Sequence, residues 1–304
     1  MAVNLDVEIA GIKLKNPVIA ASGTFGYGEE YSEVTDISKL GAIITKTVTL
    51  KPREGNPPPR LCETPSGMLN SIGLQNDGIE ALVKEHLPFL SKFKVPVIVN
   101  IAGDTPEEFA ALAKRLDKEP VVKGLELNIS CPNVKQGGML FGVDPKLTVE
   151  VVKAVKKVTA LPIIAKLTPN VTDIALIAKA AQDAGADAVS LINTVLGMAI
   201  NVENWKSKIA AGPAGLSGPA IKPIAVRMVW QVAKAVKIPV IGIGGIMTPE
   251  DAIEFFLAGA CAVQVGTANF VDPEACAKII GGIKSYLEAR GLSGIKDLIG
   301  KANV

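Results

Sequence analysis

Short runs of apolar residues recur along the chain and alternate with segments of helical periodicity. The runs are rich in Val, Ile and Leu and are continuously apolar, whereas a strand with one face in water alternates apolar and polar positions. Continuous runs are typical of parallel strands that helices cover on both faces. The pattern predicts eight buried strands, over residues 17–21, 42–47, 97–101, 125–129, 163–167, 188–192, 240–243 and 262–265.

Helix-start signals occupy the segments between these strands. Residues 104–108 and 248–251 each place a Thr before a Pro and acidic residues, which is the favoured order for the first turn of a helix. Eight strand–helix units in succession predict a closed α/β barrel, the (β/α)8 or TIM-barrel fold. A doubly wound open sheet is the competing arrangement. No compositional break divides the chain, so we expect one domain over residues 1–304.

Three segments lie outside the strand–helix repeat. Residues 3–15 alternate across Gly11 and predict an N-terminal β-hairpin that caps the bottom of the barrel. Residues 50–76 and 196–223 are too long and too polar for simple connections. Loops of this length inside a compact domain are usually functional, so we expect both at the C-terminal face of the barrel, beside an active site.

Polar residues follow most of the apolar strands. Active sites of such barrels lie at the C-terminal ends of the strands, so these side chains are expected to converge on one mouth. A single polar residue at a strand end usually marks only the start of a loop. Polar residues at the ends of six of the eight strands instead favour a ligand-binding site. Lys and Asn there supply donors for carbonyl and anionic groups. The residues are Ser22, Lys46, Thr47, Asn100, Asn128, Lys166, Asn193 and Thr194.

Glycines follow the last two strands, at Gly244-Gly245 and at Gly266 before Thr267. Many barrels of this kind bind a phosphate at this point, because glycines let backbone N–H groups approach an anion closely. A lone Gly-Gly pair would indicate only a tight turn. Two such sites on adjacent strands predict a cofactor that carries a phosphate.

Composition narrows the possible functions. Thirty-two Lys and Arg residues stand against 30 Asp and Glu, a net charge of +2, which predicts neither a nucleic-acid footprint nor a polybasic membrane patch. No apolar run has the length of a membrane helix, and the N-terminus lacks a signal-peptide pattern. We therefore expect a soluble, cytoplasmic protein. His86 is the sole histidine and no two cysteines form a CxxC pair, so no metal or iron–sulfur site is predicted in this chain.

One cysteine has an unusual position. Residues 127–133 read Leu-Asn-Ile-Ser-Cys-Pro-Asn and place Cys131 directly after the fourth strand. Cys62, Cys261 and Cys276 are expected to be small buried apolar residues, as most free cysteines are. Cys131 instead falls at the barrel mouth. A thiol has a pKa of about 8.5, so a positive neighbourhood would make it a competent base near neutral pH.

Three motifs resemble those of dihydroorotate dehydrogenases: residues 70–76 (Asn-Ser-Ile-Gly-Leu-Gln-Asn), 128–133 and 243–246 (Ile-Gly-Gly-Ile). The resemblance covers essentially the whole chain, with the motifs in order. A cysteine at position 131 is similar to class 1, because the membrane-associated class 2 enzymes have serine there. Residues 134–138 and 193–198 are similar to class 1B, the NAD-linked type. That type works with a second subunit that carries FAD and a [2Fe-2S] cluster, usually as a heterotetramer around a homodimer of catalytic subunits.

The resemblance implies an activity and roles for residues. It implies FMN-dependent oxidation of dihydroorotate to orotate in pyrimidine biosynthesis, with Cys131 as the base and Lys166 as the cation beside the reduced flavin. Lys46 is expected to contact both flavin and substrate. The substrate-binding set is Lys46, Asn70, Ser71, Ile72, Gly73, Leu74, Asn128, Asn193 and Thr194. The FMN-binding set is Ser22, Lys46, Thr47, Asn100, Asn128, Lys166, Ile192, Gly218, Gly244, Gly245, Gly266 and Thr267.

Three alternatives stay open at the level of sequence. A class 1A-like enzyme would pass its electrons to fumarate instead of NAD. A related FMN-dependent dihydropyrimidine dehydrogenase would take a neutral ring in place of the orotate carboxylate. A flavin-free, phosphate-binding isomerase or aldolase would share the barrel and the glycines but would be colourless.

Overall fold

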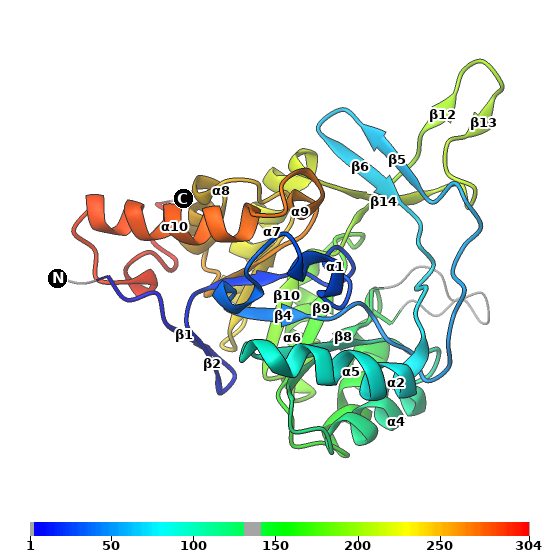
Figure 1. Cartoon of the computed structure of the whole chain (residues 1–304), viewed down its shortest axis with the longest axis horizontal. Helices are drawn as coiled ribbons and strands as arrows, with labels where there is room; N and C mark the ends of the chain where they lie inside the picture. Colours follow the sequence, from blue (N-terminus) through cyan, green and yellow to red (C-terminus); the bar gives the residue numbers. More distant parts are fainter. Residues whose placement is uncertain (1–2, 131–140, 304) are drawn as a thin grey trace.

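Eight parallel strands close into a barrel in the computed structural model, which describes residues 3–130 and 141–303 (Figure 1). Their side chains are almost entirely buried, as the continuous apolar runs predict. Going around the barrel from β3, the order is β3, β4, β7, β8, β9, β10, β15 and β16, and β16 pairs with β3. The (β/α)8 fold is confirmed. The strands are β3 (Val18–Ala20), β4 (Ala42–Ile44), β7 (Val97–Ile101), β8 (Val122–Asn128), β9 (Ile163–Leu167), β10 (Ala188–Leu191), β15 (Val240–Ile243) and β16 (Ala262–Val265).

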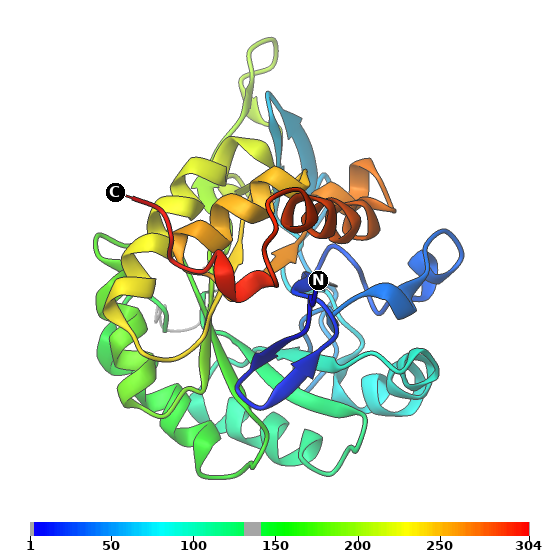
Figure 2. The same ribbon diagram turned by 90° about the vertical axis from the view of Figure 1, so that its left-hand side faces the viewer.

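Helices surround the barrel and cover its outer face (Figure 2). Two of them begin at the predicted caps. Thr105 accepts a hydrogen bond from the backbone N–H of Glu108, and Thr248 and Asp251 form a reciprocal capping box. The long helices are α4 (Pro106–Leu116), α5 (Pro145–Lys156), α6 (Ile174–Asp183), α7 (Lys222–Ala235), α8 (Pro249–Ala258) and α10 (Ala275–Ala289). Shorter ones are α1 (Glu29–Ser32), α2 (Gly78–Ala81), α3 (Leu87–Leu90) and α9 (Ala268–Val271).

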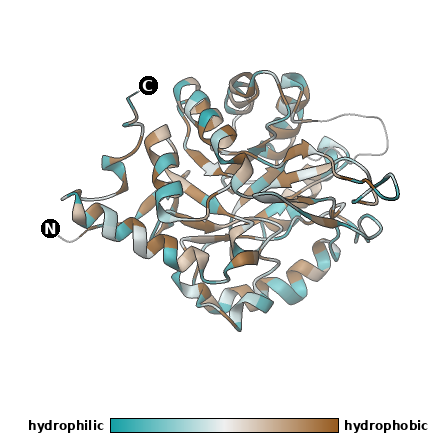
Figure 3. Cartoon of the chain, turned by 90° about the horizontal axis from the view of Figure 1, so that it is seen from above, coloured by the Kyte–Doolittle hydropathy of each residue, from teal (hydrophilic) through white to brown (hydrophobic). Residues whose placement is uncertain are grey.

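The main core lies between the barrel and these helices. Phe109, Phe255 and Phe256 are fully buried there. Apolar positions gather toward the barrel and polar positions toward the outer helix faces (Figure 3). Along residues 3–130 and 141–303, no helix is both long and apolar enough to cross a bilayer.

The predicted N-terminal hairpin is present. β1 (Val7–Ile9) pairs antiparallel with β2 (Ile12–Leu14), and the chain turns at Ala10 and Gly11. The hairpin lies at the bottom of the barrel (Figure 2). Ile12 reaches the fourth barrel strand, since a Cβ on Gly124 would come within 2.8 Å of it. The hairpin therefore closes the end of the barrel opposite the strand C-termini.

A second, antiparallel sheet stands over the C-terminal face of the barrel (Figure 1). It is built from the two long connections, whose strands lie side by side in the order β11, β14, β6, β5. The sequence pattern predicts these connections as functional loops but misses their strands. The strands are β5 (Leu61–Thr64), β6 (Gly67–Asn70), β11 (Val195–Gly197) and β14 (Ala214–Ser217); β12 (Ile200–Asn201) and β13 (Lys206–Ser207) form a projecting hairpin beyond them.

Candidate active site

A cavity of about 310 Å³ lies between the C-terminal ends of the barrel strands and the outer sheet. This volume is in the range of small-molecule sites. All the predicted site residues that the structure describes line this one cavity, although they come from distant parts of the chain. They are Ser22, Lys46, Thr47, Asn70, Ser71, Ile72, Gly73, Leu74, Asn100, Asn128, Lys166, Ile192, Asn193, Thr194, Gly218, Gly244, Gly245, Gly266 and Thr267.

The predicted base, Cys131, lies outside the described residues. Its neighbour Ser130 lines the cavity and donates a 2.9 Å hydrogen bond to Oδ1 of Asn128. The Asn193 amide hydrogen-bonds to the Ser130 hydroxyl, and Asn193 Oδ1 accepts from the backbone N–H of Thr194 at 2.8 Å. The polar ends of β8 and β10 are therefore linked to each other directly before position 131.

The two cavity lysines differ in their surroundings. Lys166 is buried, and its Nζ lies 3.1 Å from Oε1 of Glu126, a fully buried carboxylate in β8. Lys46 has no ion-pair partner within the part of the chain that the structure describes. Lys46 is therefore the cation that is available to an anionic ligand, while the charge of Lys166 is balanced by the carboxylate of Glu126. Glu126 was not predicted from the sequence, although a charged residue in an apolar strand, two positions before Asn128, was a usable signal.

Three cavity glycines have backbone conformations that other residues rarely adopt. Gly245 has φ +73°, and a Cβ there would lie 2.7 Å from Cβ of Lys222. Gly218 has φ +92°, and its Cβ would lie 2.8 Å from Cα of Gly67. Gly244, with φ +126°, is equally restricted. Backbone in these turns borders the cavity directly, which suits close approach to an anion.

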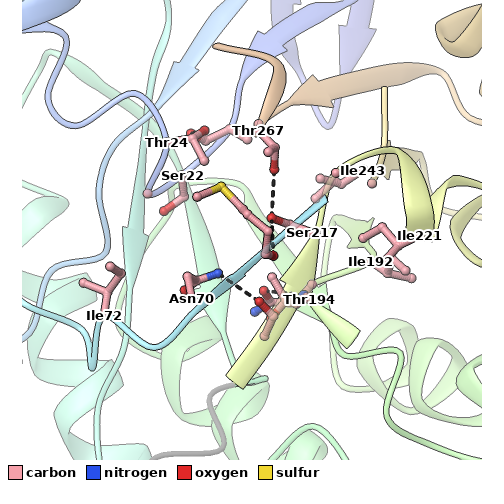
Figure 4. Close-up of a pocket in the computed structure, with 18 of the residues that line it drawn as sticks. Ser22, Thr24, Asn70, Ile72, Ile192, Thr194, Ser217, Ile221, Ile243 and Thr267 are labelled. Carbon is pink, nitrogen blue, oxygen red and sulfur yellow. Dashed lines mark hydrogen bonds between the residues drawn. The ribbon is translucent and has the colours of Figure 1, made fainter. Parts of the chain in front are cut away.

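Ser217, Thr24 and Asn170 also line the cavity and were not predicted. Thr267 donates a 2.9 Å hydrogen bond to Ser217 (Figure 4). Asn170 donates to the carbonyl of Thr194 at 3.1 Å and so holds the loop after β10 in place. Asn170 lies three residues after the fifth strand, so it was predictable as one of the polar residues that follow barrel strands at the mouth. Ser217 belongs to the unpredicted sheet.

The three described cysteines lie away from the cavity lining. Burial raises the pKa of the Cys261 thiol to about 11 and that of Cys276 to about 12. Both are therefore neutral thiols near pH 7, consistent with a packing role. Cys276 is buried as predicted, whereas Cys62, on β5, and Cys261 are only partly buried and so are less buried than predicted.

Comparison with known proteins decides the family. A family model described as dihydroorotate dehydrogenase matches residues 4–287. The chain belongs to the dihydroorotate dehydrogenase family. A relative from Geotalea uraniireducens is 60% identical over 297 residues, which is 98% of this chain and 97% of the relative. Another, from Caldicellulosiruptor saccharolyticus, is 60% identical over 301 residues, 99% of this chain and 100% of the relative. Both are named dihydroorotate dehydrogenase B (NAD(+)), catalytic subunit. The predicted family is confirmed.

Proposed function

We propose that this chain is the catalytic subunit of an NAD-linked dihydroorotate dehydrogenase, which oxidises dihydroorotate to orotate for pyrimidine biosynthesis. The observation that carries the proposal is the convergence of two lysines and a set of asparagines on one cavity at the mouth of the barrel. The names of relatives at 60% identity over nearly the full chain support the same activity.

The cavity residues fit FMN. A Cβ at Gly244, Gly245 or Gly218 would lie 2.7 to 2.9 Å from neighbouring protein atoms, so these turns require glycine, and backbone N–H groups in such turns suit a bound phosphate. Asn100 is fully buried, and its Oδ1 lacks a hydrogen-bond partner in the described structure. This oxygen is an acceptor for a ring N–H, and the oxidised flavin ring carries one. The residues that would hold FMN are Ser22, Lys46, Thr47, Asn100, Asn128, Lys166, Ile192, Gly218, Gly244, Gly245, Gly266 and Thr267.

The remaining polar lining suits orotate, a planar ring with amide groups and a carboxylate. Lys46 provides the positive charge for the carboxylate, because no acidic side chain among the described residues balances it. Asparagine side chains both donate and accept, so they match the ring amides. The proposed substrate set is Lys46, Asn70, Ser71, Ile72, Gly73, Leu74, Asn128, Asn193 and Thr194.

Oxidation removes a proton from C5 and a hydride from C6 of dihydroorotate. FMN, when bound, supplies the hydride acceptor. Cys131 is proposed to take the C5 proton as its thiolate. Asn128 and Asn193, joined through Ser130, hold the ring next to that position in the chain.

Electrons must then leave the chain to reach NAD. We propose that they pass to a partner subunit that carries FAD and a [2Fe-2S] cluster, within a heterotetramer built on a homodimer of this chain. The names of the relatives, which call them catalytic subunits, support the existence of a partner. We further propose that residues 1–304 act as one FMN-binding domain and that the assembly works in the cytoplasm.

The test is purification of the chain with and without its proposed partner. We expect a yellow protein with one FMN per chain, and dihydroorotate oxidation by NAD only in the presence of the partner. Equal activity with fumarate and no need for a partner would favour the class 1A-like alternative. Reduction of the bound flavin by dihydrouracil but not by dihydroorotate would favour a dihydropyrimidine dehydrogenase. A colourless protein that does not take up FMN would contradict the proposed function.

A further inference from the structure

Glu126 is fully buried inside the barrel and does not line the cavity. Its carboxylate accepts four hydrogen bonds. Its Oε1 accepts from Lys166 Nζ at 3.1 Å and from Asn100 Nδ2 at 2.7 Å. Its Oε2 accepts from Ser190 Oγ at 2.8 Å and from Gln264 Nε2 at 2.6 Å. Both oxygens act only as acceptors, which is the pattern of an ionised carboxylate.

These donors form a layer that crosses the barrel. Asn100 lies on β7, Lys166 on β9 and Ser190 on β10, while Gln264 lies on β16, four positions around the barrel from β8. Glu126 therefore contacts the opposite wall. The layers inside such barrels are usually filled by Val, Ile and Leu. A charged layer is costly to bury, and packing alone gives no reason for it.

Two members of the layer also line the cavity: Lys166 and Asn100. Glu126 acts on each in a different way. Its charge balances that of Lys166. Its Oε1 also accepts a hydrogen bond from the NH2 group of Asn100, which fixes the orientation of that amide. The Oδ1 of Asn100, which has no partner in the described structure, is then the atom available to a ligand. Glu126 itself, Ser190 and Gln264 do not line the cavity.

We propose that Glu126 is a positioning residue that sets the charge and hydrogen-bonding polarity of the cofactor site through Lys166 and Asn100. This inference rests on the proposed function, in that the ligand above the layer is taken to be a flavin. Reduction adds negative charge to a flavin, so the cation of Lys166 favours the reduced form. The carboxylate of Glu126 offsets part of that effect and so lowers the reduction potential of the bound flavin.

Glu126→Gln is the variant that isolates charge from shape. A Gln at this position keeps one acceptor oxygen for Lys166 and Asn100. Its NH2 group then faces Ser190, whose hydroxyl can accept, and Gln264, whose Oε1 lacks a partner in the described structure. Gln264 needs only to rotate its amide to accept. Each of the four residues that contact Glu126 thus keeps a partner at position 126, while Lys166 loses its counter-charge.

The measurement is the reduction potential of FMN bound to the purified chain, determined against a reference dye without dihydroorotate. We expect Glu126→Gln to favour reduced over oxidised FMN by about tenfold or more, which is about 30 mV for a two-electron couple. Ser190→Ala is the matched control, because it removes a neutral donor from the same carboxylate. For Ser190→Ala the ratio of reduced to oxidised FMN at a given potential should stay within threefold of that of the unmodified chain. Adding Lys166→Met to Glu126→Gln restores the charge balance and should lower the potential again by about 30 mV, a tenfold change in the ratio of reduced to oxidised FMN.

Other results would overturn the inference. A Glu126→Gln potential that is unchanged or lower, or an equal rise in Ser190→Ala, would leave Glu126 with a structural role alone. If Glu126→Gln does not fold but the double variant does, the unpaired charge of Lys166 is the cause, which supports the inference. If neither variant folds, the layer is structural and the inference fails. A folded chain that takes up no FMN would instead contradict the proposed function.

Discussion

Thr267 donates a 2.9 Å hydrogen bond to Ser217, and this contact joins the end of the last barrel strand to the outer sheet. Thr267 lies two residues after the end of β16, whereas Ser217 is the last residue of β14, and both line the cavity (Figure 4). The next residue, Gly218, packs its backbone against Gly67 of β6. The glycine turns of the barrel and of the outer sheet are therefore held at a fixed separation around the proposed phosphate site.

Ser217→Ala should weaken FMN binding modestly. A neutral hydrogen bond contributes about 1 kcal/mol, so we expect the dissociation constant to rise about fivefold. Fluorescence titration of the FMN-free chain with FMN measures it. Ser285→Ala, which removes an exposed hydroxyl from α10, serves as the control and should leave the constant unchanged. Equal affinities for both variants would mean that this contact does not organise the site.

Gly245→Ala should abolish FMN retention with little loss of fold. The new methyl group would meet Lys222 at 2.7 Å in a backbone conformation that disfavours side chains, so the turn must shift away from its position at the cavity. We expect at least a tenfold loss in FMN affinity, measured by flavin absorbance after gel filtration.

Gly281→Ala is the matched control for that change. Gly281 lies within α10, and a Cβ there meets nothing within 4 Å. Replacing a helical Gly by Ala stabilises a helix by up to about 1 kcal/mol, so this variant should hold FMN fully and melt at a slightly higher temperature. FMN retention by Gly245→Ala equal to that of Gly281→Ala would remove Gly245 from the phosphate site.

Cys131→Ala should keep FMN and lose turnover at neutral pH, because the proposed base is gone while the cavity lining is intact. Cys131→Ser should recover activity as the pH rises, since a hydroxyl ionises at far higher pH than a thiol. Steady-state dihydroorotate oxidation across pH, with bound FMN quantified in each sample, gives the comparison. Full activity of the alanine variant would exclude Cys131 from the mechanism.

The barrel was predictable because strands that are buried on both faces appear in the sequence as continuous apolar runs. Each of the eight apolar runs, such as residues 163–167, became a barrel strand. The cavity lining followed from one rule, that parallel strands end at a common mouth. The resemblance to a family supplied residues from the long connections, such as Asn70, that no strand-end rule reaches.

The outer sheet and the buried layer were not predictable in the same way. β6 and β14 pair across a separation of well over 100 residues, and neither has a clear alternating pattern. Glu126 and Gln264 sit in otherwise apolar strands, where their charge and polarity conflict with the pattern that identified those strands. What brings them together is closure of the barrel, which places β8 opposite β16.

The stability of the protein should fall at alkaline pH because of buried thiols. Burial raises the pKa of Cys276 from 9.0 to about 12. Below pH 9 the thiol is neutral in both states, so it has no effect on the pH dependence. Above pH 9 the unfolded chain loses this proton while the folded chain retains it, which favours unfolding. The free energy of unfolding should therefore fall by about 1.4 kcal/mol per pH unit from this thiol, until the folded state also ionises.

Cys276→Ala removes that contribution and should flatten the decline between about pH 9 and pH 11, as measured by urea unfolding. Ile279→Val on the same helix is the control, because it removes a buried methyl group without a titrating group. It should lower stability by about 1 kcal/mol at every pH and leave the slope unchanged. Burial also raises the pKa of Cys261 to about 11, so this thiol adds a further decline in the free energy of unfolding with pH, which both variants retain. Parallel curves for Cys276→Ala and Ile279→Val would show that the Cys276 thiol ionises equally in the folded and unfolded chain.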